Sequence, residues 1–141
     1  DSKIKRVILC SGKVYFDLLE VRREQNIQNV VIIRVEQLYP WPRGSITEQL
    51  LRYSNADVVW AQEEASNQGS WHFVSDRLNY ILSTLDLKTK RNRSVIYVGR
   101  RASASPATGA LKVHNKEQSF LIDQALNGKG SDIIQPYIPK K

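Results

Sequence analysis

A chain of 141 residues has the length of one ordinary domain, and 41% apolar residues suffice for one hydrophobic core without disulfide bonds. No apolar run approaches the roughly 18 residues of a membrane-spanning helix, so we expect no membrane partner. The net charge of +7 arises mostly from a basic loop at residues 88–93 and a basic C-terminal end, so we expect no nucleic-acid partner.

The N-terminus has neither a methionine nor the apolar core of a signal peptide, so we expect the chain to begin inside a longer protein. The single cysteine, Cys10, excludes an internal disulfide and suits a reducing compartment. Because Cys10 ends a strand-like run, we interpret it as a small buried hydrophobe, with a reactive thiol as the alternative.

Four short apolar runs rich in β-branched residues predict buried strands at residues 6–10, 30–35, 57–62 and 94–99. Successive apolar positions imply that both faces of each strand are buried, so helices should cover the sheet from both sides. Together with the helical segments between them, the strands predict a three-layer α/β domain with a mainly parallel sheet.

Apolar residues at helical spacing predict helices at residues 11–26, 42–53, 70–85 and 113–127. Ser11 is a candidate N-cap for the first helix, and Ser45 with Glu48 resembles a capping box in the second. The buried faces should include Val14, Leu18 and Val21; Ile46, Leu50 and Leu51; Phe73, Val74, Leu78, Ile81 and Leu82; and Val113, Phe120, Leu121 and Leu126.

The loops after the predicted strands are where ligands bind in open parallel sheets. In the first loop, CSGK at residues 10–13, free backbone N–H groups at a helix start could hold an anion with help from Lys13. The loop lacks the second glycine and the Gly-Lys-Ser/Thr ending of a phosphate-binding loop, so a purely structural turn is the alternative.

The second loop, EQLYPWP at residues 36–42, takes an extended or turned path because Pro40 and Pro42 exclude a regular helix. Its Trp41 suits packing against another chain or domain. Arg43 follows at the start of the next helix, which is an unfavourable place for a cation unless an anion is shared with it.

The third loop, QEEASNQG at residues 62–69, begins with the adjacent carboxylates Glu63 and Glu64. Adjacent residues of an extended chain point to opposite faces, which argues against a two-carboxylate mechanism acting on one substrate. One of them could cap the helix that begins near Ser70, and the other could reach a partner chain. The candidate interface residues are Trp41, Glu63, Glu64 and Gln68.

The fourth loop, GRRASASPATG at residues 99–109, is the best ligand candidate. The guanidinium groups of Arg100 and Arg101 suit phosphate or carboxylate, and the small residues after them allow close approach of a ligand or a neighbouring chain. Salt-bridged surface arginines are the alternative. His72 and His114 lack the pattern of a triad or a metal site, so we expect no catalytic residue and no metal ligands.

Five stretches resemble one protein family, in order and at similar spacing, over about residues 5–127. They are CSGKVYFDL, RVEQLYPWP, WAQEEASNQGSW, YVGRRASASPATG and KVHNKEQ. The family is the C-terminal domain of the thiamine-diphosphate-dependent decarboxylating component of 2-oxoglutarate dehydrogenase. The resemblance implies a transketolase C-terminal-type fold with one antiparallel edge strand, formed by residues 1–127 and followed by a tail at 128–141.

The parent enzyme of this family is an oxidoreductase of the tricarboxylic acid cycle. It decarboxylates 2-oxoglutarate on thiamine diphosphate with magnesium and passes the succinyl group to a lipoyl-bearing succinyltransferase. The resemblance implies a homodimer in the bacterial cytoplasm or the mitochondrial matrix, with both cofactors bound by other domains of the same polypeptide. We therefore expect this chain alone to bind no cofactor and to be inactive.

The resemblance also implies structural and dimerisation roles and, in some members, an allosteric site for acetyl-CoA or an adenine nucleotide. Arg100 and Arg101 match the arginine-bearing loop of the family, although some members have proline in place of Arg101. Arg43 and Lys13 are further candidates for contacts with an effector's phosphates. The alternatives are the same domain of a 2-oxoadipate dehydrogenase and a free-standing module that binds CoA or a nucleotide.

Overall fold

The computed structural model describes residues 2–104 and 111–128, in which strands and helices alternate strictly. The strands are β1 (Arg6–Cys10), β2 (Val30–Arg34), β3 (Asp57–Ala65) and β4 (Ile96–Arg100). The helices are α1 (Val14–Glu24), α2 (Arg43–Arg52), α3 (Trp71–Thr89) and α4 (Leu111–Asn127). The eight predicted elements are thus confirmed, β1 with the predicted ends and the other seven with shifted ends.

The described strands form one sheet in the order β2-β1-β3-β4, and each neighbouring pair is parallel. Each strand is joined to the next by a helix that returns the chain to the same end of the sheet, which is what parallel pairing requires. The predicted parallel α/β architecture is confirmed. The antiparallel edge strand that the resemblance implied is not among the strands of residues 2–104 and 111–128.

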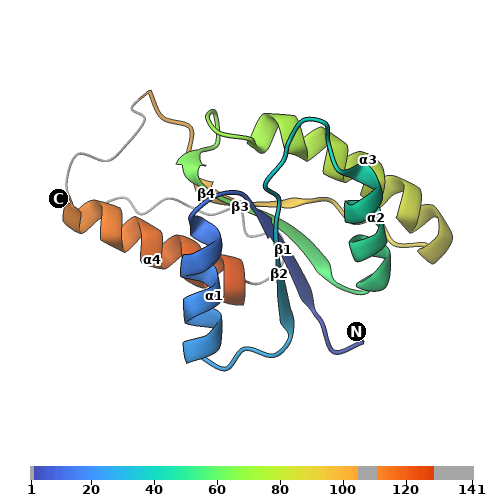
Figure 1. Ribbon diagram of the computed structural model, residues 1–141, viewed down its shortest axis with the longest axis horizontal. Coiled ribbons are helices and arrows are strands. Elements are labelled where there is room, and N and C mark those ends of the chain that lie inside the picture. Colours follow the sequence, from blue (N-terminus) through green and yellow to red (C-terminus); the bar gives the residue numbers. More distant parts are fainter. Residues whose placement is uncertain (1, 105–110, 129–141) are drawn as a thin grey trace.

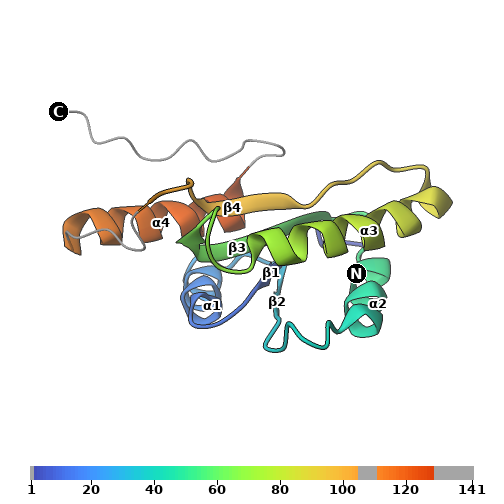
Figure 2. The same cartoon turned by 90° about the horizontal axis from the view of Figure 1, so that it is seen from above.

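The helices cover both faces of the sheet, as the doubly apolar strands predicted. Helices α1 and α4 lie on one face, and α2 and α3 lie on the other (Figures 1 and 2). The chain runs outward from β1 to β2 and then crosses back to β3, so the strand order reverses between β1 and β3. At such a reversal the loops on either side diverge and leave a crevice at the carboxyl ends of the strands.

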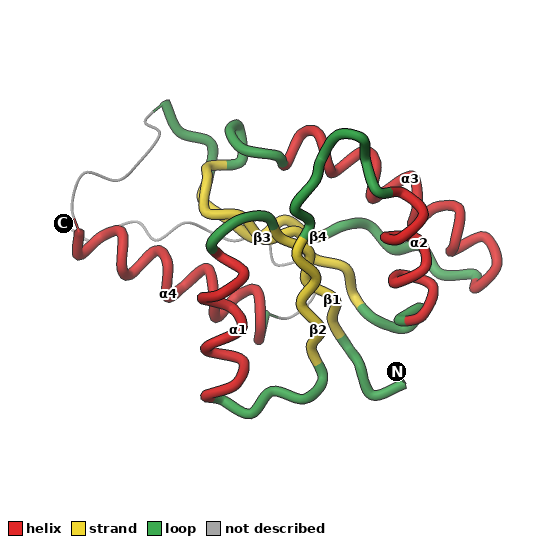
Figure 3. The backbone as a smooth tube through the Cα atoms, viewed as in Figure 1, coloured by secondary structure: helices red, strands yellow, loops and turns green. Residues whose placement is uncertain are grey.

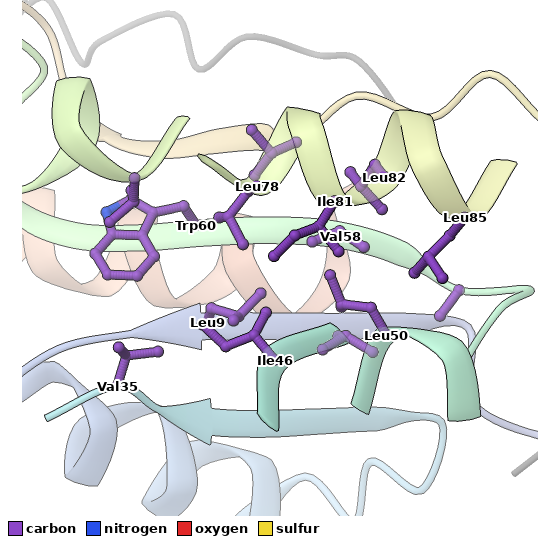
Figure 4. Packing of buried hydrophobic residues seen from close by; sticks show 14 residues of the cluster. Leu9, Val35, Ile46, Leu50, Val58, Trp60, Leu78, Ile81, Leu82 and Leu85 are labelled. Carbon is purple, nitrogen blue, oxygen red and sulfur yellow. The ribbon is translucent and has the colours of Figure 1, made fainter. Parts of the chain in front are cut away.

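Two apolar clusters hold the layers together. Figure 4 shows the one beneath α2 and α3, where Trp60 of β3 is almost fully buried close to Leu78 of α3. The opposite cluster joins Ile8 and Val59 of the sheet to Leu18 of α1 and Leu121 of α4. Burying each large side chain contributes roughly 1.5–3 kcal/mol, so these clusters fix the sheet on which the loops are mounted.

Arg6 ties the first strand to the last helix. Its buried guanidinium donates hydrogen bonds to the carbonyl oxygens of Gln124 at 3.0 Å and Ala125 at 3.1 Å, and also to that of Gly128. These carbonyls lie at the C-terminal end of α4, where helical N–H partners run out, and that of Gln124 also accepts a hydrogen bond of 3.0 Å from Gly128 N. Burial lowers the pKa of Arg6, an effect that the charge of Asp57 opposes.

The predicted helix caps are wrong. Helix α1 begins at Val14 with Lys13 in the cap position, because Gly12 turns the chain at a φ of +77° after Ser11. Helix α2 begins at Arg43 directly after Pro42, so Ser45 already lies inside its first turn. Neither helix has a side-chain hydrogen bond at its cap.

Some predicted core positions are exposed. Leu51 is 55% exposed because it lies about 100° around α2 from the buried Leu50, on the outer side of that helix. On α4, Phe120 is 37% exposed and Val113 is half-buried, and the buried positions are Leu121, Ile122, Ala125 and Leu126. Among the helices of the described ranges, none has the length and apolar character needed to cross a membrane.

Candidate functional site

A pocket of about 270 Å³ opens at the carboxyl edge of the sheet. The loops that follow β1, β3 and β4 leave the sheet at this edge (Figure 3), and the first half of α4 closes the pocket's side. It is lined by Lys13, Glu63, Glu64, Arg100, His114, Glu117, Gln118 and Leu121. The structure thus brings two candidate effector residues, Lys13 and Arg100, together with two candidate interface residues, Glu63 and Glu64.

A charged cluster joins three elements on one side of the pocket. Lys13 Nζ lies 2.9 Å from Asp17 Oδ2 and 3.3 Å from Glu63 Oε1. Gln118 Nε2 of α4 donates a hydrogen bond of 2.9 Å to each of the same two carboxylates. The hydrogen bond to Asp17 raises the pKa of Lys13, and Glu63 adds to this. Because Lys13 is 68% exposed, solvent screens these interactions and the ammonium group remains able to exchange partners.

Arg100 also lines the pocket and contacts two acidic residues. Its Nε donates a hydrogen bond of 3.1 Å to the backbone carbonyl of Glu63, and its Nη1 lies 3.8 Å from Glu117 Oε2. The oxygen of Glu117 is buried, yet it accepts no hydrogen bond within the described part of the chain. The pocket therefore holds a guanidinium beside a carboxylate at the outer limit of ion-pair distance.

Gln62 stabilises the end of β3, which carries Glu63 and Glu64, and the turn that follows it. Its Oε1 accepts a hydrogen bond of 2.9 Å from Trp60 Nε1. Its Nε2 donates to the carbonyl oxygens of Glu64, Ala65 and Gln68, at 3.2, 3.0 and 2.9 Å. Since Gln62 is buried, these bonds satisfy an amide that would otherwise destabilise the fold, and they fix the course of the loop.

The loop after β3 is joined in turn to the arginine-bearing loop. Ser66 N donates to the carbonyl of Arg100 at 3.0 Å, and the side chains of Asn67 and Gln68 donate to the carbonyl of Ser103 at 3.0 and 3.3 Å. Tyr97 Oη lies 2.7 Å from the carbonyl oxygen of Arg100. Burial raises the pKa of Tyr97, so its phenol stays protonated and can donate this bond. The backbone that carries Arg100 is therefore held from two sides.

The remaining candidates lie elsewhere. Arg101 follows β4, is exposed and is not among the residues that line the pocket, and residues 105–110 of its loop lie outside the described ranges. Arg43 belongs to the α2–α3 side of the sheet, where its guanidinium lies 4.7 Å from the ring centroid of Tyr80. Trp41 is on the same side, with its ring in edge contact with Phe73. The effector candidates therefore do not form a single cluster.

The structure also bears on two expectations about residues near the pocket. Neither Glu63 nor Glu64 caps α3, because Ser70 occupies the cap position without a side-chain hydrogen bond. Cys10 is fully buried and burial raises the pKa of its thiol to about 12, in agreement with its interpretation as a small buried hydrophobe. Within residues 2–104 and 111–128, no group of three or more His, Cys, Asp or Glu side chains is arranged to hold a metal ion.

Sequence reasoning missed the contribution of α4 to the pocket. His114, Glu117 and Gln118 come after the fourth loop, and only the packing of α4 beside α1 brings them back to β1 and β3. A usable signal was present for Gln62, because an amide inside an otherwise apolar strand needs buried hydrogen-bond partners.

A sequence profile of the family described as 2-oxoglutarate dehydrogenase C-terminal matches residues 1–126. The chain belongs to this family. The 2-oxoglutarate dehydrogenase E1 components of Brucella anthropi, Brucella ovis and Brucella canis are each 45% identical to it over 126 residues. That alignment covers 89% of this chain and 12% of each relative, so the chain spans only a small part of the curated relatives it matches.

The match confirms the resemblance seen in the five sequence stretches. Every residue that lines the pocket of this 2-oxoglutarate dehydrogenase C-terminal domain lies inside the matched range. The pocket contains cationic groups of Lys13 and Arg100 whose carboxylate partners are also in the pocket or beside it. Such an arrangement can bind an anion by exchanging one carboxylate partner for another anionic group.

Proposed function

We propose that this chain is the C-terminal part of a 2-oxoglutarate dehydrogenase E1 component and serves there as a structural, dimerisation and regulatory domain. In the parent reaction, 2-oxoglutarate is decarboxylated on thiamine diphosphate with magnesium, and the succinyl group passes to a lipoyl-bearing succinyltransferase. The 45% identity to E1 components supports the parentage. Both cofactors would be bound by parts of the parent that precede this domain, in a bacterial cytoplasm or a mitochondrial matrix.

The regulatory role rests on one observation, the pocket at the carboxyl edge with Arg100 and Lys13 in its lining. We assign this pocket to the phosphate groups of an effector such as acetyl-CoA or an adenine nucleotide. Guanidinium groups bind phosphate oxygens in pairs, and an ammonium group adds a point charge. At about 270 Å³ the pocket is smaller than most sites that enclose a whole ligand, so the nucleoside would extend past Arg101 toward solvent.

Calorimetric titration with acetyl-CoA and with ADP tests this role. The double variant Arg100→Ala, Arg101→Ala should bind at least about tenfold more weakly than the wild-type chain, because charge-assisted contacts to phosphate are lost. Arg43→Ala is the matched control, since it removes an arginine from the other face of the sheet and should leave affinity unchanged. Full affinity in the double variant would place the effector site elsewhere.

Two alternatives fit the same domain. In a 2-oxoadipate dehydrogenase it would have the same supporting role, because substrate choice is made outside this chain. A free-standing module would bind CoA or a nucleotide without a catalytic partner. The full-length gene product separates the module from both dehydrogenases, since it shows whether thiamine-binding domains precede Asp1.

A further inference from the structure

The charged side chains of Arg100 and Glu117 are neighbours in the pocket, but the ion pair between them is long. Nη1 of Arg100 and Oε2 of Glu117 are 3.8 Å apart, beyond hydrogen-bond distance, although the two side chains are only 19% and 22% exposed. The same oxygen is buried and accepts no hydrogen bond from residues 2–104 or 111–128. This one oxygen has thus lost hydration without gaining a hydrogen bond in return, so it is the weakly satisfied part of the Glu117 carboxylate.

The helix holds Glu117 in this position. The next residue, Gln118, donates hydrogen bonds of 2.9 Å to Asp17 and Glu63, which fixes this turn of α4 against the charged cluster around Lys13. Arg100 is fixed from its own side, since its Nε bonds the carbonyl of Glu63 at 3.1 Å. These contacts restrain the turn of α4 that carries Glu117 and the guanidinium of Arg100.

We propose that Glu117 is a built-in competitor of the anionic ligand, whose carboxylate occupies the place at Arg100 that a phosphate group takes on binding. This inference rests on the effector role proposed for the pocket and adds its regulation. A phosphate group that approaches the guanidinium to about 2.8 Å makes stronger contacts than a carboxylate held at 3.8 Å, so it displaces Glu117.

Glu117→Gln tests the proposal because the amide keeps the size of the side chain and removes its charge. Titration calorimetry with inorganic pyrophosphate and with ADP should give a dissociation constant about fivefold lower for this variant than for the wild-type chain, the scale of one part-exposed ion pair. Glu64→Gln is the matched control, since Glu64 lines the same pocket and the change removes the same charge there. Its dissociation constant should stay within about twofold of wild type, because Glu64 is exposed and solvent screens its charge.

The outcomes separate this inference from the effector role. If the wild-type chain binds the probes and Glu117→Gln binds them no better, or if Glu64→Gln gains as much, the competitor role is overturned while the effector role stands. If neither the wild-type chain nor Glu117→Gln binds either probe, both are overturned. A gain in Glu117→Gln that disappears when Arg100→Gln is added supports the proposal. Glu117→Ala should reproduce the gain, with circular dichroism confirming that each variant is folded.

Discussion

At the scale of single residues, a closely bonded pair of charges lies away from the pocket, where the chain passes from α3 to β4. Asp86 Oδ2 accepts a hydrogen bond of 2.6 Å from the backbone N–H of Arg93, and its Oδ1 accepts bonds of 2.9 and 2.7 Å from the Arg93 side chain. Arg93 also donates to the carbonyl of Ala56 at 3.2 Å. Both side chains are almost fully buried, so Arg93 is a structural part of the basic loop that composition assigned to solvent.

We predict that Asp86→Asn lowers the free energy of unfolding by about 3 kcal/mol, because removing one partner leaves a buried charge without compensation. Burial alone would raise the pKa of Asp86, but the hydrogen bonds and charge of Arg93 outweigh it and hold the pKa below its usual value. A carboxyl whose pKa is lowered by folding contributes stability above its unfolded pKa, near 4, and loses it as the pH falls further.

Urea unfolding at pH 7 and at successively lower pH measures this effect. The difference between wild type and Asp86→Asn should be largest at pH 7 and should shrink as the pH falls below about 4. Asp76→Asn, on the exposed side of the same helix, is the control and should change stability by less than about 0.5 kcal/mol. Equal stability of the two variants at pH 7 would contradict the structural role of the pair.

At the scale of elements, the packing of β4 against β3 requires glycine at position 99. A Cβ atom at Gly99 would collide with the phenol of Tyr97, with Cζ only 2.6 Å away, and with the carbonyl oxygen of Gln62 at 2.9 Å. That phenol bonds the carbonyl of Arg100, and Gln62 fixes the neighbouring loop. Gly99 is therefore a point at which β4 passes close to the backbone of β3.

We predict that Gly99→Ala destabilises the chain by about 1–3 kcal/mol, as overpacking does in well-packed sites. Gly44→Ala is the matched control, because a Cβ at this position of α2 meets no atom within 4 Å. It should be neutral or stabilising by up to about 1 kcal/mol, since alanine favours the helix. Chemical denaturation of both variants measures the difference, and an equal midpoint for the two would contradict the predicted collision.

The sequence allowed the elements to be predicted better than their ends. Apolar β-branched runs identify the four strands because burial on both faces excludes polar residues, as at Val7, Ile8 and Leu9. The start of α1 was not predictable from capping preferences, because the turn at Gly12 sets it. The role of α4 in the pocket was not predictable either, since Glu117 and Gln118 reach it only through tertiary packing, which leaves no local pattern.

At the scale of the whole molecule, the pocket lies away from the second predicted loop. The pocket occupies the carboxyl edge, whereas Trp41, Arg43 and the exposed Tyr39 belong to the second loop and the α2–α3 side. The strand reversal between β1 and β3 places the crevice where the first and third predicted loops meet. The carboxyl edge was predicted from the alternation of strands and helices, whereas the strand order and the full set of residues that line the pocket were not.

We predict that the purified chain neither decarboxylates 2-oxoglutarate nor binds thiamine diphosphate with magnesium, because in our proposal the preceding domains bind the cofactor and carry out the reaction. Release of carbon dioxide from 2-oxoglutarate in the presence of both cofactors measures decarboxylation, and calorimetry measures the binding of thiamine diphosphate. A full-length E1 component assayed in parallel is the positive control. Turnover by the purified chain would overturn the assignment of the chemistry to other domains.

The guanidinium of Arg6 has a consequence for how the domain is attached to its surroundings. It joins the first residue of β1 to the carbonyls at the end of α4, so residues 2–5 and Gly128 depart from the same amino edge of the sheet. A polypeptide that continues from residue 2 or from Gly128 would thus leave from the edge of the sheet opposite to the pocket. The domain has the connectivity of a unit that can be appended, inserted or circularly permuted without re-routing its core.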